Sequence, residues 1–149
     1  MELNLHGTAQ TIGQALQRAR EAETAGFSGI FFADSQLLTL DPFQILSLCA
    51  TQTTRLRLGT AVSNMVYRDA TVLANSAATV NEVSGGRAIL GLGTGDGPVY
   101  ALNRKATKLA QFEEGLRTIR ALLRGETISV PSGKERFTEG RVKLRVGKV

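Results

Sequence analysis

Three short polar segments contain the residue types that ligand chemistry needs, and each one comes directly after an apolar run. They are Asp34-Ser35-Gln36, 60–64 and 94–97. A carboxylate at the end of a strand can accept hydrogen bonds from a ligand or transfer a proton, so Asp34 and Asp96 are the candidate catalytic residues. For any single aspartate, capping a turn or pairing with an arginine is the more common role.

The scarcity of histidine and cysteine excludes several kinds of site. His6 is the only histidine and Cys49 the only cysteine in the 149 residues. A Ser-His-Asp triad, a multi-histidine metal site and an intrachain disulfide are therefore excluded, and we expect no bound metal. Cys49 lies in an apolar helical stretch and is predicted to be a buried core residue.

Alternating glycines between residues 91 and 97 resemble a dinucleotide-binding loop only superficially. The Rossmann fingerprint needs Gly-x-Gly-x-x-Gly running straight into a helix. Counted from either of the first two glycines, the last position holds Asp96 or Pro98, and the next predicted helix begins only near Thr107. The pattern therefore disfavours a Rossmann site. For the first and last glycines, a role as simple chain turns is an equal alternative.

The elements that must position these segments alternate between strand and helix. Buried apolar runs predict strands, and apolar residues at helical spacing predict helices. The predicted strands are 2–6, 29–33, 55–62 and 87–92, and the predicted helices are 11–25, 41–50, 69–83 and 109–123, with Asp41 and Asp69 as caps. Residues 128–130 and 142–146 predict a hairpin within a terminal segment 127–149.

Repeated βα units imply a parallel sheet with helices outside it, in a single domain over 1–149. Because strands of such a sheet end on the same side, the three polar segments should converge there. Phe27, Phe31 and Phe32 are predicted core residues and not a base-stacking platform, and Arg87 is predicted to be the solvated start of a strand.

The charge distribution and the chain start bear on partners and location. The net charge is +5, with nine Lys or Arg against three Glu from 117 to 149. Only one aromatic residue, Phe137, accompanies them, so we expect a solvated surface and no nucleic-acid partner. No basic leader or apolar run of membrane-spanning length is visible, which predicts a cytoplasmic protein without a membrane partner.

Segments 22–35, 54–64 and 84–96 resemble, in order and spacing, the first repeats of bacterial luciferase-like oxidoreductases. The helix over 109–123 and the following Arg124-Gly125-Glu126 complete a resemblance that covers about residues 21 to 126. The Asp34-Ser35-Gln36 form is most similar to the methylenetetrahydromethanopterin-reductase-like branch, which uses a deazaflavin coenzyme.

The resemblance implies the N-terminal half, about four βα units, of a TIM-type (β/α)8 barrel. It also implies FMN or coenzyme F420 as cofactor, with the ring at the C-terminal face of the strands, and a small-molecule substrate. The two cofactors present the same tricyclic shape, so the sequence does not choose between them. The family's phosphate site lies largely in loops later than these.

The resemblance assigns residues to the ring site one by one. Asp34 and Ser35 would touch the ring or the substrate, and a non-prolyl cis peptide between Ala61 and Val62 would support one face of the ring. The remaining implied cofactor-binding residues are Thr60, Asn64, Thr94, Gly95 and Asp96. Some relatives have a histidine where Ser35 stands, so a histidine acid or base is not implied here.

Two function classes follow. In the first, the chain is part of an oxidoreductase that transfers hydride or performs monooxygenation, and it is too short to be the whole enzyme. In the second, it is a non-enzymatic half-barrel, whose open strand edges recruit a second copy or a separate C-terminal half.

Overall fold

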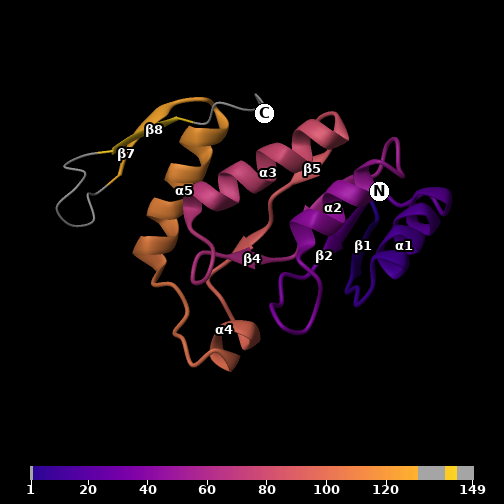
Figure 1. Cartoon of the computed structure of the whole chain (residues 1–149), viewed down its shortest axis with the longest axis horizontal. Helices are drawn as coiled ribbons and strands as arrows, with labels where there is room; N and C mark the ends of the chain where they lie inside the picture. The colour runs from indigo at the N-terminus through magenta and orange to yellow at the C-terminus, as the bar shows by residue number, and fades with distance from the viewer. Residues whose placement is uncertain (1, 131–139, 144–149) are drawn as a thin grey trace.

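A parallel sheet covered by helices on one face forms the centre of the molecule (Figure 1). The structure is a computed structural model that describes residues 2–130 and 140–143. The sheet has the order β1-β2-β3-β5, and every neighbouring pair is parallel. Its strands are β1 (Asn4–Gly7), β2 (Gly29–Phe32), β3 (Arg57–Thr60) and β5 (Ala88–Ile89), and the long helices are α1 (Ile12–Thr24), α2 (Pro42–Ala50), α3 (Ala70–Ser84) and α5 (Leu109–Leu123). This is the α/β half-barrel architecture that the sequence predicts.

The two faces of this sheet differ in burial. Leu5, Ile30, Leu58 and Ala88 are neighbours in the strand register and pack with the helices in one apolar core. The opposite face carries His6, which is exposed, and Phe31, which is half-buried. In a closed barrel that second face is the packed interior. Here it remains open, and so do the outer edges of β1 and β5 within the described residues.

The predicted strands 55–62 and 87–92 are each shorter and divided. Beyond β3 and β5, the chain forms β4 (Ser63–Asn64) and β6 (Leu92–Gly93), which pair with each other in parallel. The Thr60 hydroxyl explains the interruption, because it donates to the Gly91 carbonyl at 2.8 Å and accepts from the Gly91 N–H at 3.0 Å. A side chain thus takes the place of backbone pairing at this bulge.

The helix predictions hold closely. Asp41 caps α2 by accepting hydrogen bonds from the N–H groups of Phe43 and Gln44, and Asp69 caps α3 by accepting one from Thr71. The α5 helix has the predicted bounds. One helix was not predicted: α4 (Gly97–Ala101) is only five residues long and contains a proline in its first turn.

The terminal segment contains an antiparallel pair, β7 (Thr127–Val130) and β8 (Gly140–Lys143). This confirms a hairpin, although its second strand begins earlier than predicted. The expected turn 131–133 and residues 144–149 lie outside the described residues. In Figure 1, α5 lies beside α3, and the hairpin extends beyond α5, away from the sheet.

Arg87 corrects a prediction, because it is not a solvated strand start. Its guanidinium donates to the carbonyls of Ala50, Thr53, Leu56 and Ser84 at 2.7–3.1 Å, and to the Thr53 hydroxyl at 3.1 Å. These acceptors lie where α2 and α3 end and where the chain approaches β3, so Arg87 ties the ends of α2 and α3 to the sheet on the side away from the predicted site.

Cys49 lies in the core between α1 and α2, as predicted. It is fully buried, with Sγ 3.7 Å from the Ala15 carbonyl oxygen. Burial raises the pKa of the thiol to about 11, against a smaller opposing effect of Arg20.

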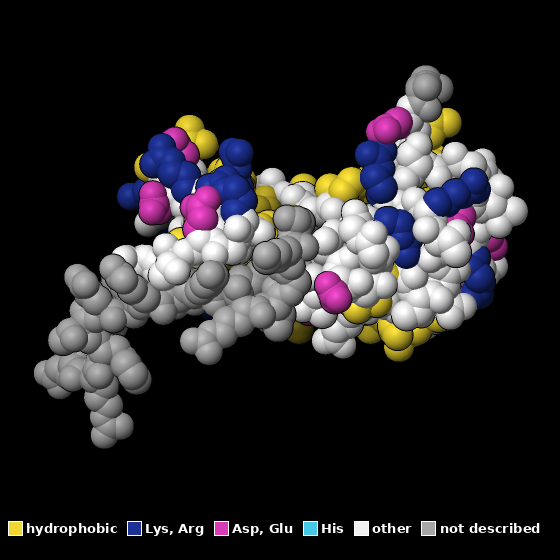
Figure 2. Space-filling view, turned by 90° about the horizontal axis from the view of Figure 1, so that it is seen from above, with side chains coloured by type: hydrophobic (Ala, Val, Ile, Leu, Met, Phe, Trp, Pro, Cys, Tyr) yellow, Lys and Arg dark blue, Asp and Glu magenta, His cyan; other side chains and the backbone are white. Residues whose placement is uncertain are grey.

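The surface charges are mixed. On the face shown in Figure 2, Lys and Arg side chains occur at both ends, with Asp and Glu among them. None of the helices within residues 2–130 has the length and apolar character that crossing a bilayer requires.

Candidate functional site

The three predicted polar segments do converge at the C-terminal end of the sheet. The pairing of β4 with β6 places Asn64 beside Gly93, and Ser63 reaches back to Asp34 after β2. The Gln36 amide donates to the carbonyl of Pro98 at 2.7 Å, which joins the first segment to α4, directly after the third. Whether these residues contact a cofactor stays a prediction, but their convergence is a feature of the fold.

Asp34 is buried, and both of its carboxylate oxygens are engaged. Oδ2 accepts hydrogen bonds from the Ser63 hydroxyl and from Arg68 Nε, both at 2.6 Å, and Oδ1 accepts one from Arg68 Nη2 at 3.0 Å. Only 3% of the residue is exposed. The geometry favours arginine pairing, the common alternative for an aspartate, and its catalytic role stays a prediction.

Arg68 connects two carboxylates. Besides Asp34, its Nη2 donates to Asp41 Oδ2 at 2.9 Å, and its guanidinium carbon lies 5.1 Å from the centre of the Phe43 ring. Burial lowers the pKa of Arg68, but the hydrogen bonds and charges of Asp34 and Asp41 raise it by more, so the net change is upward. The guanidinium is therefore charged near neutral pH.

Tyr67 adds a phenol to the group of side chains around Asp34. Its hydroxyl donates to the backbone carbonyl of Asp34 at 2.5 Å. Burial and then the charge of Asp34 raise its pKa, against an opposing hydrogen bond from Asn64, and Asp96 adds a smaller upward effect. Tyr67 is therefore a protonated hydrogen-bond donor near neutral pH.

Sequence reasoning places neither Tyr67 nor Arg68 among the site residues. The available signal is that Arg68 directly precedes Asp69, which caps a helix. The partner of Arg68 is Asp34, however, which lies 34 residues away in the chain. Pairing over such a separation leaves no periodic pattern in one sequence.

The second segment forms one wall of the site, in which polar side chains are buried and an apolar side chain is exposed. Thr60 and Asn64 are buried, and Asn64 Oδ1 accepts a hydrogen bond from the Val66 N–H at 3.0 Å. The peptide bond between Ala61 and Val62 is cis, as the resemblance implies, and the Ala61 carbonyl oxygen lies 3.0 Å from His6 Nε2. The Val62 side chain is 46% exposed and presents an apolar surface.

The third segment has a shape that only glycine permits. Gly95 has φ +105°, and a Cβ there would lie 2.7 Å from the Val99 side chain. Thr94 accepts a hydrogen bond from the Thr107 N–H through its carbonyl at 2.7 Å. Asp96 is exposed at the start of α4, and its carboxylate accepts no hydrogen bond from the described residues. Of the two candidate carboxylates, Asp96 is therefore the one that a ligand can reach.

Ser35 lies in a turn whose backbone is well connected. Its carbonyl accepts hydrogen bonds from the N–H groups of Leu38 and Thr39 at 3.1 and 3.0 Å. The turn presents Leu37 outward, with 90% of its surface exposed. Ser35 is half-buried at the base of this turn, between the buried Asp34 and the exposed leucine.

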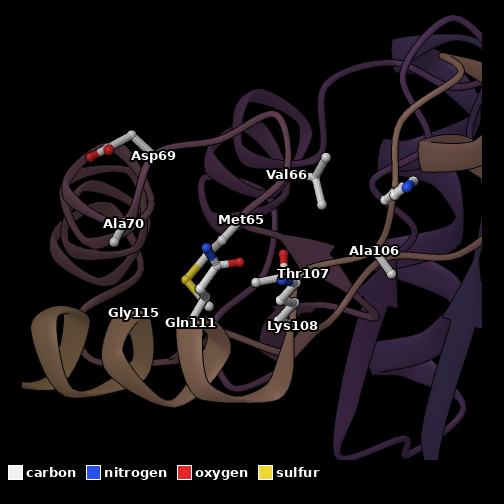
Figure 3. Close-up of a pocket in the computed structure, with 10 residues that line it drawn as sticks. Met65, Val66, Asp69, Ala70, Ala106, Thr107, Lys108, Gln111 and Gly115 are labelled. Atoms are coloured by element: carbon white, nitrogen blue, oxygen red, sulfur yellow. The ribbon is translucent and has the colours of Figure 1, made fainter.

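A groove of about 520 Å³ adjoins this site, but none of the predicted catalytic or cofactor-binding residues lines it. It lies between the β4–α3 loop and the start of α5 (Figure 3). Met65 reaches towards α5 there, and a Cβ at Gly115 would lie 2.2 Å from the Met65 sulfur. Within residues 2–130 and 140–143, no three metal-ligating side chains come together.

Comparisons with known proteins identify the family. The family model described as luciferase-like monooxygenase matches residues 2–148. A 5,10-methylenetetrahydromethanopterin reductase of Methanolobus tindarius is 32% identical over 133 residues, which are 88% of this chain and 40% of the relative. The chain thus spans less than half the length of the curated reductases it matches.

Solved structures share the fold. The coenzyme F420-dependent tetrahydromethanopterin reductase of Methanopyrus kandleri aligns with a TM-score of 0.76 and 22% identity, over 83% of this chain and 40% of that one. An FMN complex of the oxygenating constituent of 3,6-diketocamphane monooxygenase from Pseudomonas putida aligns with a TM-score of 0.74 and 16% identity, over 95% and 43%. The sequence match shows that the chain belongs to the luciferase-like monooxygenase family.

Proposed function

We propose that this chain supplies the ring-binding wall of a flavin- or deazaflavin-dependent oxidoreductase, with FMN or coenzyme F420 as the cofactor. The observation that carries the proposal is the convergence of three strand-end segments around the exposed Val62 side chain. The matched reductases and the FMN-bound neighbour support the cofactor class.

The residues present fit such a ring. A flat tricyclic ring needs an apolar surface against one face and hydrogen-bonding groups along its polar edge. Val62 offers the surface and packs over the backbone of Gly93, where a Cβ would lie 2.9 Å from the valine. Ser35, Thr94 and Asp96 offer polar groups in the first and third segments, at the same end of the sheet. Glycine at 93 keeps the backbone free of a side chain beside this surface.

When bound, the ring supplies hydride transfer to or from the substrate, or reaction with oxygen in its reduced form. The chain's own residues orient and protect it. Val62 supports one face, and Ser35 and Thr94 hold the polar edge. Asp96, the free carboxylate, holds or moves a proton at its Oδ atoms beside the substrate. Asp34 keeps the neighbouring loops in place through Arg68.

Activity belongs to a barrel larger than the four βα units described. The inner face with His6 and Phe31 is open, and the edges of β1 and β5 lack neighbours among the described residues. Four further βα units would close the barrel and add the later loops, where many TIM barrels bind phosphate. We propose that these units accompany the chain, on the same polypeptide or as a separate partner, and that the substrate is a small molecule held between the halves.

Fluorescence titration with FMN and with coenzyme F420 tests the proposal. The isolated chain should bind either one weakly or not at all, and a barrel completed with the C-terminal βα units of the matched reductase should bind one of them tightly. Tight stoichiometric binding by the monomeric chain overturns the need for a second half. A folded, completed barrel that binds neither cofactor overturns the oxidoreductase assignment.

Matched variants localise the binding. Asp96→Asn in the completed barrel should weaken cofactor or substrate binding at least tenfold. Asp69→Asn is the control, because it makes the same change at an exposed aspartate whose role is to cap α3, and asparagine caps equally well. Equal effects of the two variants contradict a role for Asp96 in the site.

The second candidate function is assembly without catalysis, and the open inner face is the observation that favours it. Two copies could close one barrel across the edges of β1 and β5. Light scattering at several protein concentrations distinguishes this from the first proposal. A clean monomer without added partner overturns self-closure.

Location and other partners stay predictions. Cell fractionation tests a cytoplasmic location. Binding assays at two salt concentrations test the expected lack of nucleic-acid binding, since such binding would weaken steeply as salt rises.

A further inference from the structure

The cluster around Arg68 contains two carboxylates that would repel each other without a cation between them. Asp34 and Asp41 both accept hydrogen bonds from the same nitrogen, Nη2, at 3.0 and 2.9 Å. Only 19% of the arginine side chain is exposed, and 2% of the Asp34 side chain. Weak solvent screening makes both the attraction to Arg68 and the repulsion between the carboxylates stronger than at the surface.

We propose that Arg68 is the positioning residue of the ring site, because its guanidinium joins the end of β2, through Asp34, to the cap of α2, through Asp41. The inference rests on the proposed function. Arg68 is adjacent in sequence to Asp69, which caps α3. One side chain therefore fixes the starts of two helices relative to the strand end that carries Asp34.

The wall of the site follows from this arrangement. Asp34 Oδ2 also accepts the Ser63 hydroxyl, and the Asp34 carbonyl accepts the Tyr67 hydroxyl. Ser63 directly follows Val62, whose exposed side chain supports the ring. Loss of Arg68 removes the partner of Asp34, and the segment from Val62 to Tyr67 then loses its fixed anchor.

Lysine cannot substitute for arginine in this arrangement. The Nε and Nη2 groups form a planar fork that matches the two oxygens of Asp34, while the guanidinium carbon lies over the Phe43 ring. An ammonium group has one nitrogen and can occupy only part of this geometry. Arg68→Lys should therefore behave much more like Arg68→Gln than like the wild type.

The test compares Arg68→Gln with Arg87→Gln in two assays. Arg87 is a matched control, since it is also a partly buried arginine with several hydrogen bonds, but it lies at the opposite end of the strands. In the completed barrel, Arg68→Gln should raise the cofactor dissociation constant at least tenfold, and added guanidinium ions should restore part of the affinity. Arg87→Gln should lower stability but leave the affinity of folded protein unchanged.

The second assay is amide hydrogen exchange in the chain without cofactor. Arg68→Gln should speed exchange at 63–67 and at the first turn of α2 at least tenfold, and Arg87→Gln should not do so selectively. Unchanged exchange in Arg68→Gln overturns the proposal, and so does faster exchange with unaltered cofactor affinity. If the wild-type barrel binds no cofactor, the proposed function fails, and the exchange assay alone decides whether Arg68 positions the loops.

Discussion

Glu23, at the residue scale, joins α1 to the start of the third strand. Its Oε1 accepts hydrogen bonds from the N–H groups of Thr54, Arg55 and Leu56 at 2.8–3.0 Å. Burial raises the pKa of Glu23, but these three bonds lower it by more, so the net shift is downward. The charged carboxylate is therefore the form that the folded state stabilises.

This shift predicts how stability depends on pH. Because the folded pKa lies below the unfolded value of about 4.3, the contribution is present above that value and disappears as pH falls through the folded pKa. On acidification below about pH 4.3, the unfolding free energy of Glu23→Gln should therefore fall less than that of the wild type. Urea denaturation at several pH values measures it. Glu21→Gln, on the exposed surface of α1, is the charge-matched control, and equal slopes in wild type and Glu23→Gln contradict the prediction.

Arg87 gives a second prediction at this scale. Arg87→Met should lower the unfolding free energy by about 2–4 kcal/mol, because it leaves the buried carbonyls of Thr53 and Leu56 without donors. Chemical denaturation measures this change. Arg117→Met removes only exposed ion pairs, with Glu113 and Glu114, and should change stability by less than about 0.5 kcal/mol. A small effect at Arg87 would show that water satisfies those carbonyls.

Elements were more predictable from sequence than the contacts between them. The α5 helix has a long apolar stripe, and its predicted and observed bounds agree. The division of two strands was missed, because it depends on the Thr60 hydroxyl meeting Gly91, 31 residues later. The site shows the same limit. Its strand-end segments can be recognised in the sequence as polar residues after apolar runs. Tyr67 and Arg68 belong to the site only because tertiary contacts bring them to Asp34.

The bulge between the divided strands gives a prediction about glycine. A Cβ at Gly91 would lie 2.1 Å from the Thr60 carbonyl oxygen, which belongs to the backbone and cannot rotate away. Gly91→Ala should therefore cost about 1–3 kcal/mol of unfolding free energy or more. Gly97→Ala is the control, because no atom lies within 4 Å of its Cβ position at the start of α4. Thermal and urea unfolding of both variants test this, and equal stabilities contradict the close approach.

The open inner face is the defining feature at the scale of the whole molecule. Phe31 covers Gly59 on this face, where a Cβ would lie 2.5 Å from the aromatic ring, yet Phe31 itself is only half-buried. Further βα units would cover this aromatic surface and supply neighbours to the edges of β1 and β5.

This arrangement predicts a loss of exposed apolar surface when the barrel is completed. The chain alone should bind the dye ANS, which reports exposed apolar surface. Addition of the C-terminal units should lower the dye fluorescence and slow amide exchange in β1 and β5. Dye binding that does not change on formation of a complex would show that the partner attaches elsewhere and leaves the inner face open.

Cys49 makes the molecule suitable for a simple kinetic measurement. It is the only thiol in the sequence, it is fully buried between α1 and α2, and its pKa of about 11 keeps it in the unreactive protonated form. A thiol reagent can modify it only in molecules where these two helices have separated. The rate of labelling thus measures how often the core opens, and the measurement needs no engineered cysteine. Its slowing on addition of partner units would report how strongly barrel closure restrains the core on the helix-covered face of the sheet.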